Sequence, residues 1–184
     1  MKSIKKLIFA VIFTATIHHA NAQINSALIQ VGGLTCSMCS FSTEKAIRTL
    51  PFIKDVKANL EKAEYELTFK PEVEINLDQI AEKVTGAGFS VIKLVVSTQF
   101  DNLTITENEH VTLGKNNYHF MNVSDKVLDG TIKIQYLDRN FLSPKEFKKL
   151  SAKSTFACFQ TGKKESCCKD SKGSNSRIFH VTLI

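Results

Sequence analysis

The sequence lacks a hydrophobic run long enough to cross a membrane as a helix. Its longest apolar run, residues 7–17, has 11 residues, whereas a spanning helix needs about 20. Three lysines precede this run, and Ala20-Asn21-Ala22 follows it with the small-x-small pattern at which signal peptidases cut. We therefore expect residues 1–22 to be a signal peptide and the mature chain to begin at Gln23 without a membrane span. The alternative is a segment that stays uncut as a membrane anchor.

The chain also lacks a strong excess of charge of one sign. It has 24 Lys and Arg residues against 18 Asp and Glu residues, a formal net charge of +6. Loss of residues 1–22 removes three lysines and leaves 21 basic against 18 acidic residues, a net charge of +3. Domains that bind nucleic acid usually carry a concentrated basic surface. The composition therefore argues against DNA or RNA as a partner.

Sequence motifs typical of catalysis are missing as well. The chain has no nucleophile elbow, no glycine-rich phosphate loop and no dinucleotide fingerprint. No paired acid and base stand out. We therefore expect a protein that is not an enzyme.

The periodicity of residues 23–97 predicts a first domain. Strand-like segments at residues 27–31, 56–60, 63–69 and 89–96 surround two helices. The first helix stops before Leu50-Pro51. The second begins behind Asn76 and carries apolar residues at helical spacing. The resulting order of strand, helix, strand, strand, helix, strand is the ferredoxin-like βαββαβ arrangement.

A second, β-rich domain is expected over residues 98–184. Short alternating segments separated by turn signals predict a small, mostly antiparallel β structure, with an OB-like barrel as one form. One helix is predicted to start at Ser143-Pro144. Residues 161–177, rich in Lys and Ser, read as a flexible loop that contains Cys167 and Cys168. The overall fold class is therefore α+β.

Two cysteines at the start of the first predicted helix carry the clearest chemistry. Cys36 and Cys39 are three positions apart, next to the unpaired N–H groups and the positive end of the helix. This position favours the thiolate over the thiol. Two thiolates on an open loop suit soft Cu(I) and leave room for a third ligand from a partner. A structural zinc site would need four ligands, and no second such pair is present.

The same segment resembles a known family. Gly33-Leu34-Thr35-Cys36-Ser37-Met38-Cys39, Glu44-Lys45-Ala46-Ile47 and Ala87-Gly88-Phe89 are similar to the motifs of the heavy-metal-associated (HMA) domain. The resemblance covers residues 27–96. It implies a metal site at Cys36 and Cys39 like that of copper chaperones and of the metal-binding domains of P-type ATPases. It also implies a protein partner for metal transfer.

Several residues depart from the family pattern. Leu34 replaces a Met of the loop with a side chain of similar volume, which predicts that its anchoring role in the core is kept. Ser40 and Thr43 lie where apolar residues are usual, and Phe41 and Phe52 where small or polar ones are. Two outcomes are open: aromatic side chains exposed near the metal loop as a docking surface, or a repacked core.

The cofactor and the function keep alternatives at this stage. Cu(I) is the preferred ion, and Zn(II) and Hg(II) are the other candidates. The expected function is metal transfer, buffering or sensing in the periplasm, after secretion across the inner membrane. A thiol-disulfide oxidoreductase would use the same Cys36 and Cys39 spacing. A third reading is a protein-interaction module with a metal-sensing domain.

The remaining cysteines and histidines give weaker signals. Cys158 can form a loop-closing disulfide with Cys167 or Cys168, because export places the chain where disulfides persist. Cys167 and Cys168 are alternatively an auxiliary soft-metal site. The single histidines of the second half are interpreted as ordinary strand residues, although His119 and Met121 form a His-x-Met pair.

Overall fold

The computed structural model describes residues 23–71, 73–168 and 175–184. The predicted signal peptide, residues 1–22, lies outside the described residues, so its cleavage stays a prediction. Among the helices described, none is both long and apolar enough to cross a bilayer. The elements follow one another as β1 Gln23–Gly32, α1 Ser37–Arg48, β2 Ile53–Asn59, β3 Glu64–Phe69, α2 Leu77–Gly86, β4 Ser90–Ile105, β5 His110–Leu113, β6 Asn116–Phe120, β7 Lys126–Tyr136, the 3₁₀ helix η1 Arg139–Phe141, α3 Pro144–Ser151, α4 Ala157–Thr161 and β8 Ile178–Leu183.

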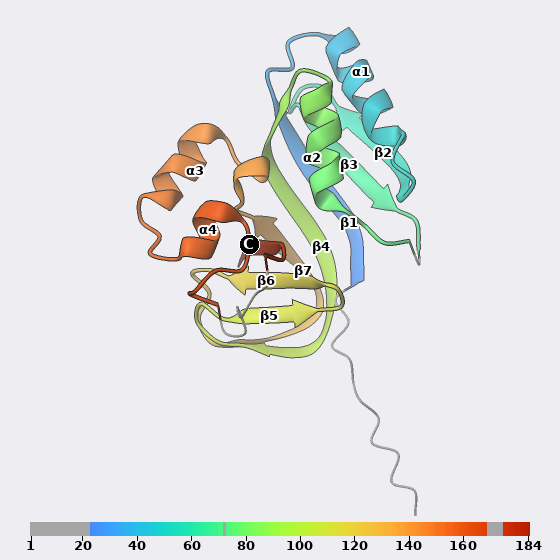
Figure 1. The fold of residues 1–184 in the computed structure, drawn as a ribbon. Coiled ribbons are helices and arrows are strands. Elements are labelled where there is room, and N and C mark those ends of the chain that lie inside the picture. Colours follow the sequence, from blue (N-terminus) through green and yellow to red (C-terminus); the bar gives the residue numbers. More distant parts are fainter. Residues whose placement is uncertain (1–22, 72, 169–174) are drawn as a thin grey trace, which may run out of the picture.

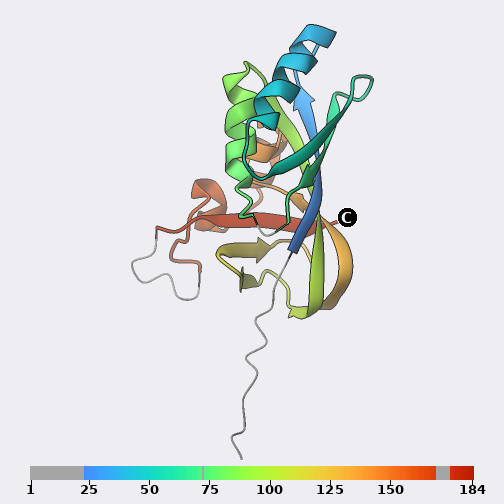
Figure 2. The same cartoon turned by 90° about the vertical axis from the view of Figure 1, so that its right-hand side faces the viewer.

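The first half has the predicted βαββαβ order. Its strands lie in the order β2-β3-β1-β4, and every neighbouring pair is antiparallel. Helices α1 and α2 lie side by side against one face of this part of the sheet (Figures 1 and 2). The ferredoxin-like prediction is therefore confirmed.

Local sequence explains these elements. In β3, Tyr65, Leu67 and Phe69 are buried and alternate with more exposed residues, as expected for a strand with one covered face. Helix α2 begins where Asn76 Oδ1 accepts a hydrogen bond from the Gln79 backbone N–H at 3.3 Å. Both features follow the periodicity and the cap that the sequence predicts.

The second half continues the same sheet and does not form a separate barrel. The α+β class is confirmed, but the OB-like barrel with one helix is wrong: all eight strands form one open sheet in the order β2-β3-β1-β4-β7-β8-β6-β5. The cause is β4, which does not end near Val96. Thr98 and Phe100 remain buried farther along it, and the strand pairs with β1 on one edge and β7 on the other.

The last strand is inserted inside the sheet. β8 pairs antiparallel with β7 and parallel with β6. The second half also has two α-helices where one was expected. α3 starts as predicted, with the Ser143 hydroxyl accepting from the Glu146 N–H at 3.3 Å, whereas α4 was not predicted. Of the expected loop 161–177, Lys163 and Arg177 form an isolated bridge, and residues 169–174 lie outside the described part of the chain.

The largest hydrophobic core runs through both halves. One connected cluster includes Ile29 and Tyr65 from the first half and Tyr136 and Phe179 from the second. Strand β4 lies between β1, which carries Ile29, and β7, which carries Tyr136 (Figure 1). Burial of apolar surface therefore holds the two halves together as one packed unit.

Candidate metal centres

The loop that carries Cys36 is placed by the end of β1. Gly33 has φ +88°, a left-handed conformation in which a Cβ is strained, so glycine suits this turn. Leu34 packs against the main core, as its apolar character predicts. Cys36 is then the N-cap residue of α1, in extended conformation. The Cys36 sulfur therefore lies at the N-terminus of α1.

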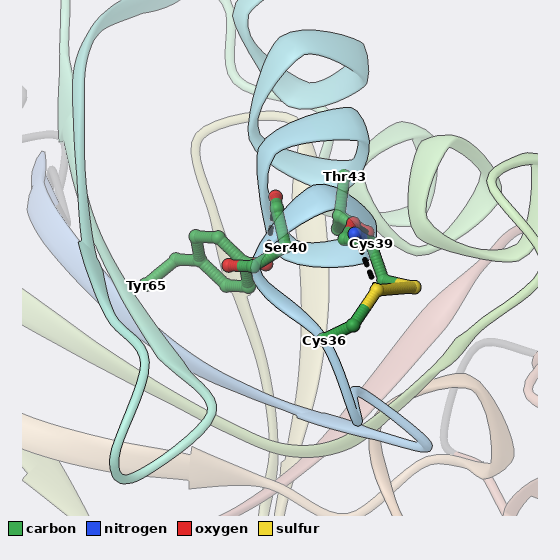
Figure 3. The surroundings of a disulfide bond; sticks show 5 residues. All are labelled: Cys36, Cys39, Ser40, Thr43 and Tyr65. Atoms are coloured by element: carbon green, nitrogen blue, oxygen red, sulfur yellow. Dashed lines mark hydrogen bonds between the residues drawn. A yellow bond between two sulfur atoms is a disulfide. The ribbon is translucent and has the colours of Figure 1, made fainter.

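The two predicted ligands meet at this end of α1. Cys36 and Cys39 form a disulfide in this structure, with their Cα atoms 5.3 Å apart (Figure 3). The Cys39 backbone N–H also donates to Cys36 Sγ at 3.1 Å. Because the thiolate is the metal ligand, the pair has to be reduced before it binds an ion. Metal binding at these two residues stays a prediction.

Reduction would leave the pair well placed for soft-metal chemistry. Cys36 is exposed and Cys39 is half-buried. The hydrogen bond from the Cys39 N–H and the helix dipole both stabilise negative charge on Cys36 Sγ. An ion held between the two sulfurs would therefore remain open to solvent and to a ligand from another protein.

Polar residues on the inner face of α1 are satisfied inside the domain. Ser40 and Thr43 are buried. The hydroxyls of Ser40 and Tyr65 are hydrogen-bonded at 2.8 Å, and the Thr43 hydroxyl donates to the Cys39 carbonyl at 3.0 Å (Figure 3). The departures from the family pattern at positions 40 and 43 are thus compensated by hydrogen bonds, which removes the cost of burying polar groups there.

The two unusual aromatic residues have different positions. Phe52 is 2% exposed and belongs to the core, whereas Phe41 is 60% exposed on α1. Met38, between the two cysteines, is 69% exposed, and Leu60 is 59% exposed. Leu60 and Cys36 also line a shallow hollow of about 160 Å³. Phe52 therefore belongs to a repacked core, whereas Phe41 is exposed near the metal loop. A docking role for Phe41 stays a prediction.

A second group of metal-ligand residues lies in the other half of the molecule. Cys158, Cys167 and Cys168 are free thiols here, so the loop-closing disulfide is not formed. Cys158 Sγ lies 3.8 Å from His110 Nε2 and 3.7 Å from His119 Nδ1. The auxiliary pair that the sequence suggested, Cys167 and Cys168, therefore has neighbours that were not predicted.

Strand pairing brings three histidines into this group. His110 on β5 pairs with His119 on β6, and His119 pairs with His180 on β8. His180 Nε2 lies 3.3 Å from Cys158 Sγ. The sequence predicts ordinary strand residues at these positions, because no sequence pattern reveals that β8 lies between β7 and β6. Only the sheet order places the rings together.

Burial changes the acid–base properties of this group. Burial, reinforced by His110 and His180, lowers the pKa of His119 to about 3. Burial likewise raises the pKa of the Cys158 thiol. In the absence of an ion, His119 is therefore neutral and Cys158 is a thiol at neutral pH.

A buried carboxylate holds His180 in place. Asp138 accepts from His180 Nδ1 and from the His180 backbone N–H, both at 3.0 Å. Arg177 donates to the same carboxylate at 2.9 Å and also to Asp78 on α2 at 2.8 Å. This network orients the His180 ring and links it to the first half. No sequence pattern predicts this network, because its members lie up to 102 positions apart in the chain, from Asp78 to His180.

Curated copper-transporting ATPases are similar to part of this chain. The chain is 38% identical over 66 residues to the probable copper-transporting ATPase HMA5 of Arabidopsis thaliana, which is 36% of this chain and 6% of that protein. It is 37% identical over 75 residues to the copper-transporting ATPase RAN1 of the same plant, 41% of this chain and 7% of that protein. The chain thus spans less than a tenth of the length of these curated relatives.

The chain is also similar to solved structures, and it matches a family model. One of these structures is the yeast copper transporter domain Ccc2a in its apo and Cu(I)-loaded states. It has 27% sequence identity and a TM-score of 0.33, and the match covers 36% of this chain and 90% of that one. The model of the heavy-metal-associated domain matches residues 28–90. Residues 28–90 of this chain are thus a heavy-metal-associated domain, the family that the motifs around Cys36 and Cys39 indicate.

Proposed function

We propose that this chain is an exported, non-enzymatic binding protein for a soft metal ion, and that the ion is Cu(I). Reduced Cys36 and Cys39 hold the ion, and the protein transfers it to a partner or buffers it. The observation that carries this proposal is the meeting of two sulfur atoms on an open loop at the N-terminus of α1. The names of the ATPases that are similar to part of this chain support copper as the cargo.

The exposed position of the loop supports transfer over permanent storage. Two thiolates leave a Cu(I) ion with a low coordination number, so a partner thiolate can join before either original bond breaks. Met38 and Phe41 are exposed beside the pair and offer apolar contacts for such a partner. Transfer would then proceed through an intermediate in which both proteins contact the ion.

An anaerobic Cu(I) titration of the reduced chain, in competition with a chromophoric Cu(I) chelator, tests the proposal. The double variant Cys36→Ser, Cys39→Ser should lose one tightly bound equivalent relative to the unchanged protein. Ser42→Ala, an exposed change on the same helix, is the matched control and should bind as the unchanged chain does. Equal Cu(I) stoichiometry and affinity in the double variant would contradict the proposal.

A second candidate function is thiol-disulfide exchange, which the Cys36–Cys39 disulfide favours. In that case the reduced pair would pass its electrons to a substrate disulfide and return to the oxidised state found here. An insulin-reduction assay separates the two candidates. A metal carrier should show no more activity than the Cys36→Ser, Cys39→Ser variant, whereas an oxidoreductase should lose its activity in that variant.

A further inference from the structure

The second half contains a dense group of metal-ligand side chains around one sulfur atom. Cys158 is fully buried on α4, which lies apart from α1 and its Cys36 loop (Figure 1). Four potential ligand atoms all lie within 4.8 Å of one another, those of His110, Cys158, Cys167 and Cys168. A second set of three also meets this distance, from His119, Cys158 and His180.

We propose that Cys158, Cys167, Cys168 and His110 form a second metal-ion site, which takes a thiophilic d¹⁰ cation, Zn(II) or Cu(I). The site does not depend on the heavy-metal-associated domain or on the function proposed for it. His119 and His180 are positioning residues that pack around the central sulfur.

The number and type of ligands fit such an ion. Three cysteine sulfurs and one imidazole nitrogen are a standard tetrahedral set for zinc, and thiolates also favour Cu(I). With metal–sulfur bonds of about 2.3 Å, ligand atoms of a tetrahedral site lie about 3.8 Å apart. Here His110 Nε2 lies 3.8 Å from Cys158 Sγ, and the sulfurs of Cys167 and Cys168 lie 4.0 Å apart. An ion could therefore bind with small side-chain movements.

The surroundings of Cys158 resemble the outer shell of a metal site. His180 donates from Nδ1 to Asp138 at 3.0 Å and turns Nε2 to Cys158 Sγ at 3.3 Å. In metal sites a carboxylate often fixes a ligating histidine in this way, and here the same arrangement fixes a histidine beside the central sulfur and not on the ion. The Nε2 atom of His119 is buried without a hydrogen-bond partner. Unpartnered polar atoms are costly in a core that serves packing alone.

The site has both a closed and an open side. Cys158 and Cys168 are buried, at 0% and 5% exposure, whereas His110 and Cys167 are half-exposed. An ion can therefore reach the ligands from solvent and is then shielded by the packed side. This arrangement favours retention of the ion, in contrast to the open pair at Cys36 and Cys39.

A titration in a chain without the first pair tests the proposal. In the full chain with Cys36→Ser and Cys39→Ser, Co(II) is added as a spectroscopic probe, and Zn(II) and Cu(I) are then titrated in separate competitions. We expect one equivalent of Co(II) with thiolate charge-transfer bands and the strong visible bands of tetrahedral coordination. Displacement by Zn(II) or by Cu(I) identifies the preferred ion.

Further substitutions define the ligands. Adding Cys167→Ser and Cys168→Ser should abolish the stoichiometric binding, and His110→Ala should weaken it. The matched control, Ser166→Ala, changes an exposed neighbour and should leave binding unchanged. Absence of a bound equivalent in the parent chain, or full binding after loss of Cys167 and Cys168, would overturn the proposal.

Alkylation of the parent chain provides a measurement that needs no substitution at the site. Zn(II) or Cu(I) should slow the reaction of Cys167, the half-exposed sulfur of the site, with N-ethylmaleimide, as mapped by mass spectrometry. If Cys167 reacts at the same rate with and without either ion, the site does not exist, even if the variants fail to fold.

Discussion

Two buried polar residues of α1, Ser40 and Thr43, each have a hydrogen-bond partner inside the protein. The hydroxyls of Ser40 and Tyr65 are hydrogen-bonded to each other near the metal loop. The Thr43 hydroxyl donates a hydrogen bond to the Cys39 carbonyl. Such buried bonds fix the first turn of α1, because breaking one leaves a desolvated group unpaired. The position of the Cys39 sulfur is therefore determined by packing below it as much as by the loop above it.

His119 is the residue with the clearest consequence for pH dependence. Burial, with His110 and His180 nearby and Asp138 opposing them, lowers its pKa to about 3, while an unfolded histidine titrates near pH 6.5. Between these values the unfolded chain binds the extra proton. The stability contributed by neutral His119 is thus complete above about pH 6.5 and is lost as the pH falls toward 3.

We expect this effect to remove about 2–3 kcal/mol of unfolding free energy between pH 7 and 4.5. Urea denaturation of metal-free protein, in the presence of a chelator, measures it at both pH values. Glutamine does not titrate in this range. The free energy of unfolding of His119→Gln should therefore fall by about 2–3 kcal/mol less than that of the unchanged protein between pH 7 and 4.5. An identical pH dependence in the two proteins would show that His119 does not carry the effect.

At the level of single elements, the turn between β1 and α1 depends on a special backbone conformation. Gly33 has φ +88°, and a Cβ there would stand 3.6 Å from Phe89. Gly33→Ala should lower the free energy of unfolding by about 1–2 kcal/mol, because the strain comes from the backbone. Urea denaturation of the reduced protein measures this change.

A glycine at the end of α2 provides the matched control. A Cβ at Gly86 would meet nothing within 4 Å, and its φ is not positive. Gly86→Ala should therefore leave stability unchanged or raise it by up to about 1 kcal/mol, through helix propensity. Equal destabilisation by the two substitutions would mean that the Gly33 conformation is not the cause.

The elements that the sequence predicted well are those with local signals. Alternation in residues 63–69, the cap at Asn76 and the Ser143-Pro144 start are each contained in a short segment, and all three have the predicted structure. The Cys36 and Cys39 pair was found for the same reason. The His110, His119 and His180 group was missed because it depends on strand order. The alternation of apolar and polar residues predicts which side chains share a face of a strand, but it does not predict which strands lie next to it.

For the molecule as a whole, the two halves should unfold together. β4 pairs with strands of both halves, one core cluster spans them, and Arg177 binds Asp78 and Asp138 at once. Phe100 is 2% exposed on β4, so Phe100→Ala should cost about 3–5 kcal/mol. Hydrogen exchange with mass spectrometry should show this loss of protection in both β3 and β8.

The exposed residue Val127, at 53% exposure on the neighbouring strand β7, provides the control for that experiment. Val127→Ala removes little buried surface, so protection in β3 and β8 should be nearly unchanged. If Phe100→Ala reduced protection in only one of the two strands, the halves would be separate cooperative units.

The shared strand limits how this protein can be recombined with others. The heavy-metal-associated match ends at residue 90, which is the first residue of β4. In a chimaera joined at this point, the new segment must therefore continue β4, which pairs with β1 on one edge and with β7 on the other. A graft that shifts the alternation by one position would turn Phe100 toward solvent. Any residues inserted or deleted at this junction must therefore be even in number, so that the side chains of β4 keep their faces. A flexible linker cannot replace the strand, because it would not pair with β1 and β7.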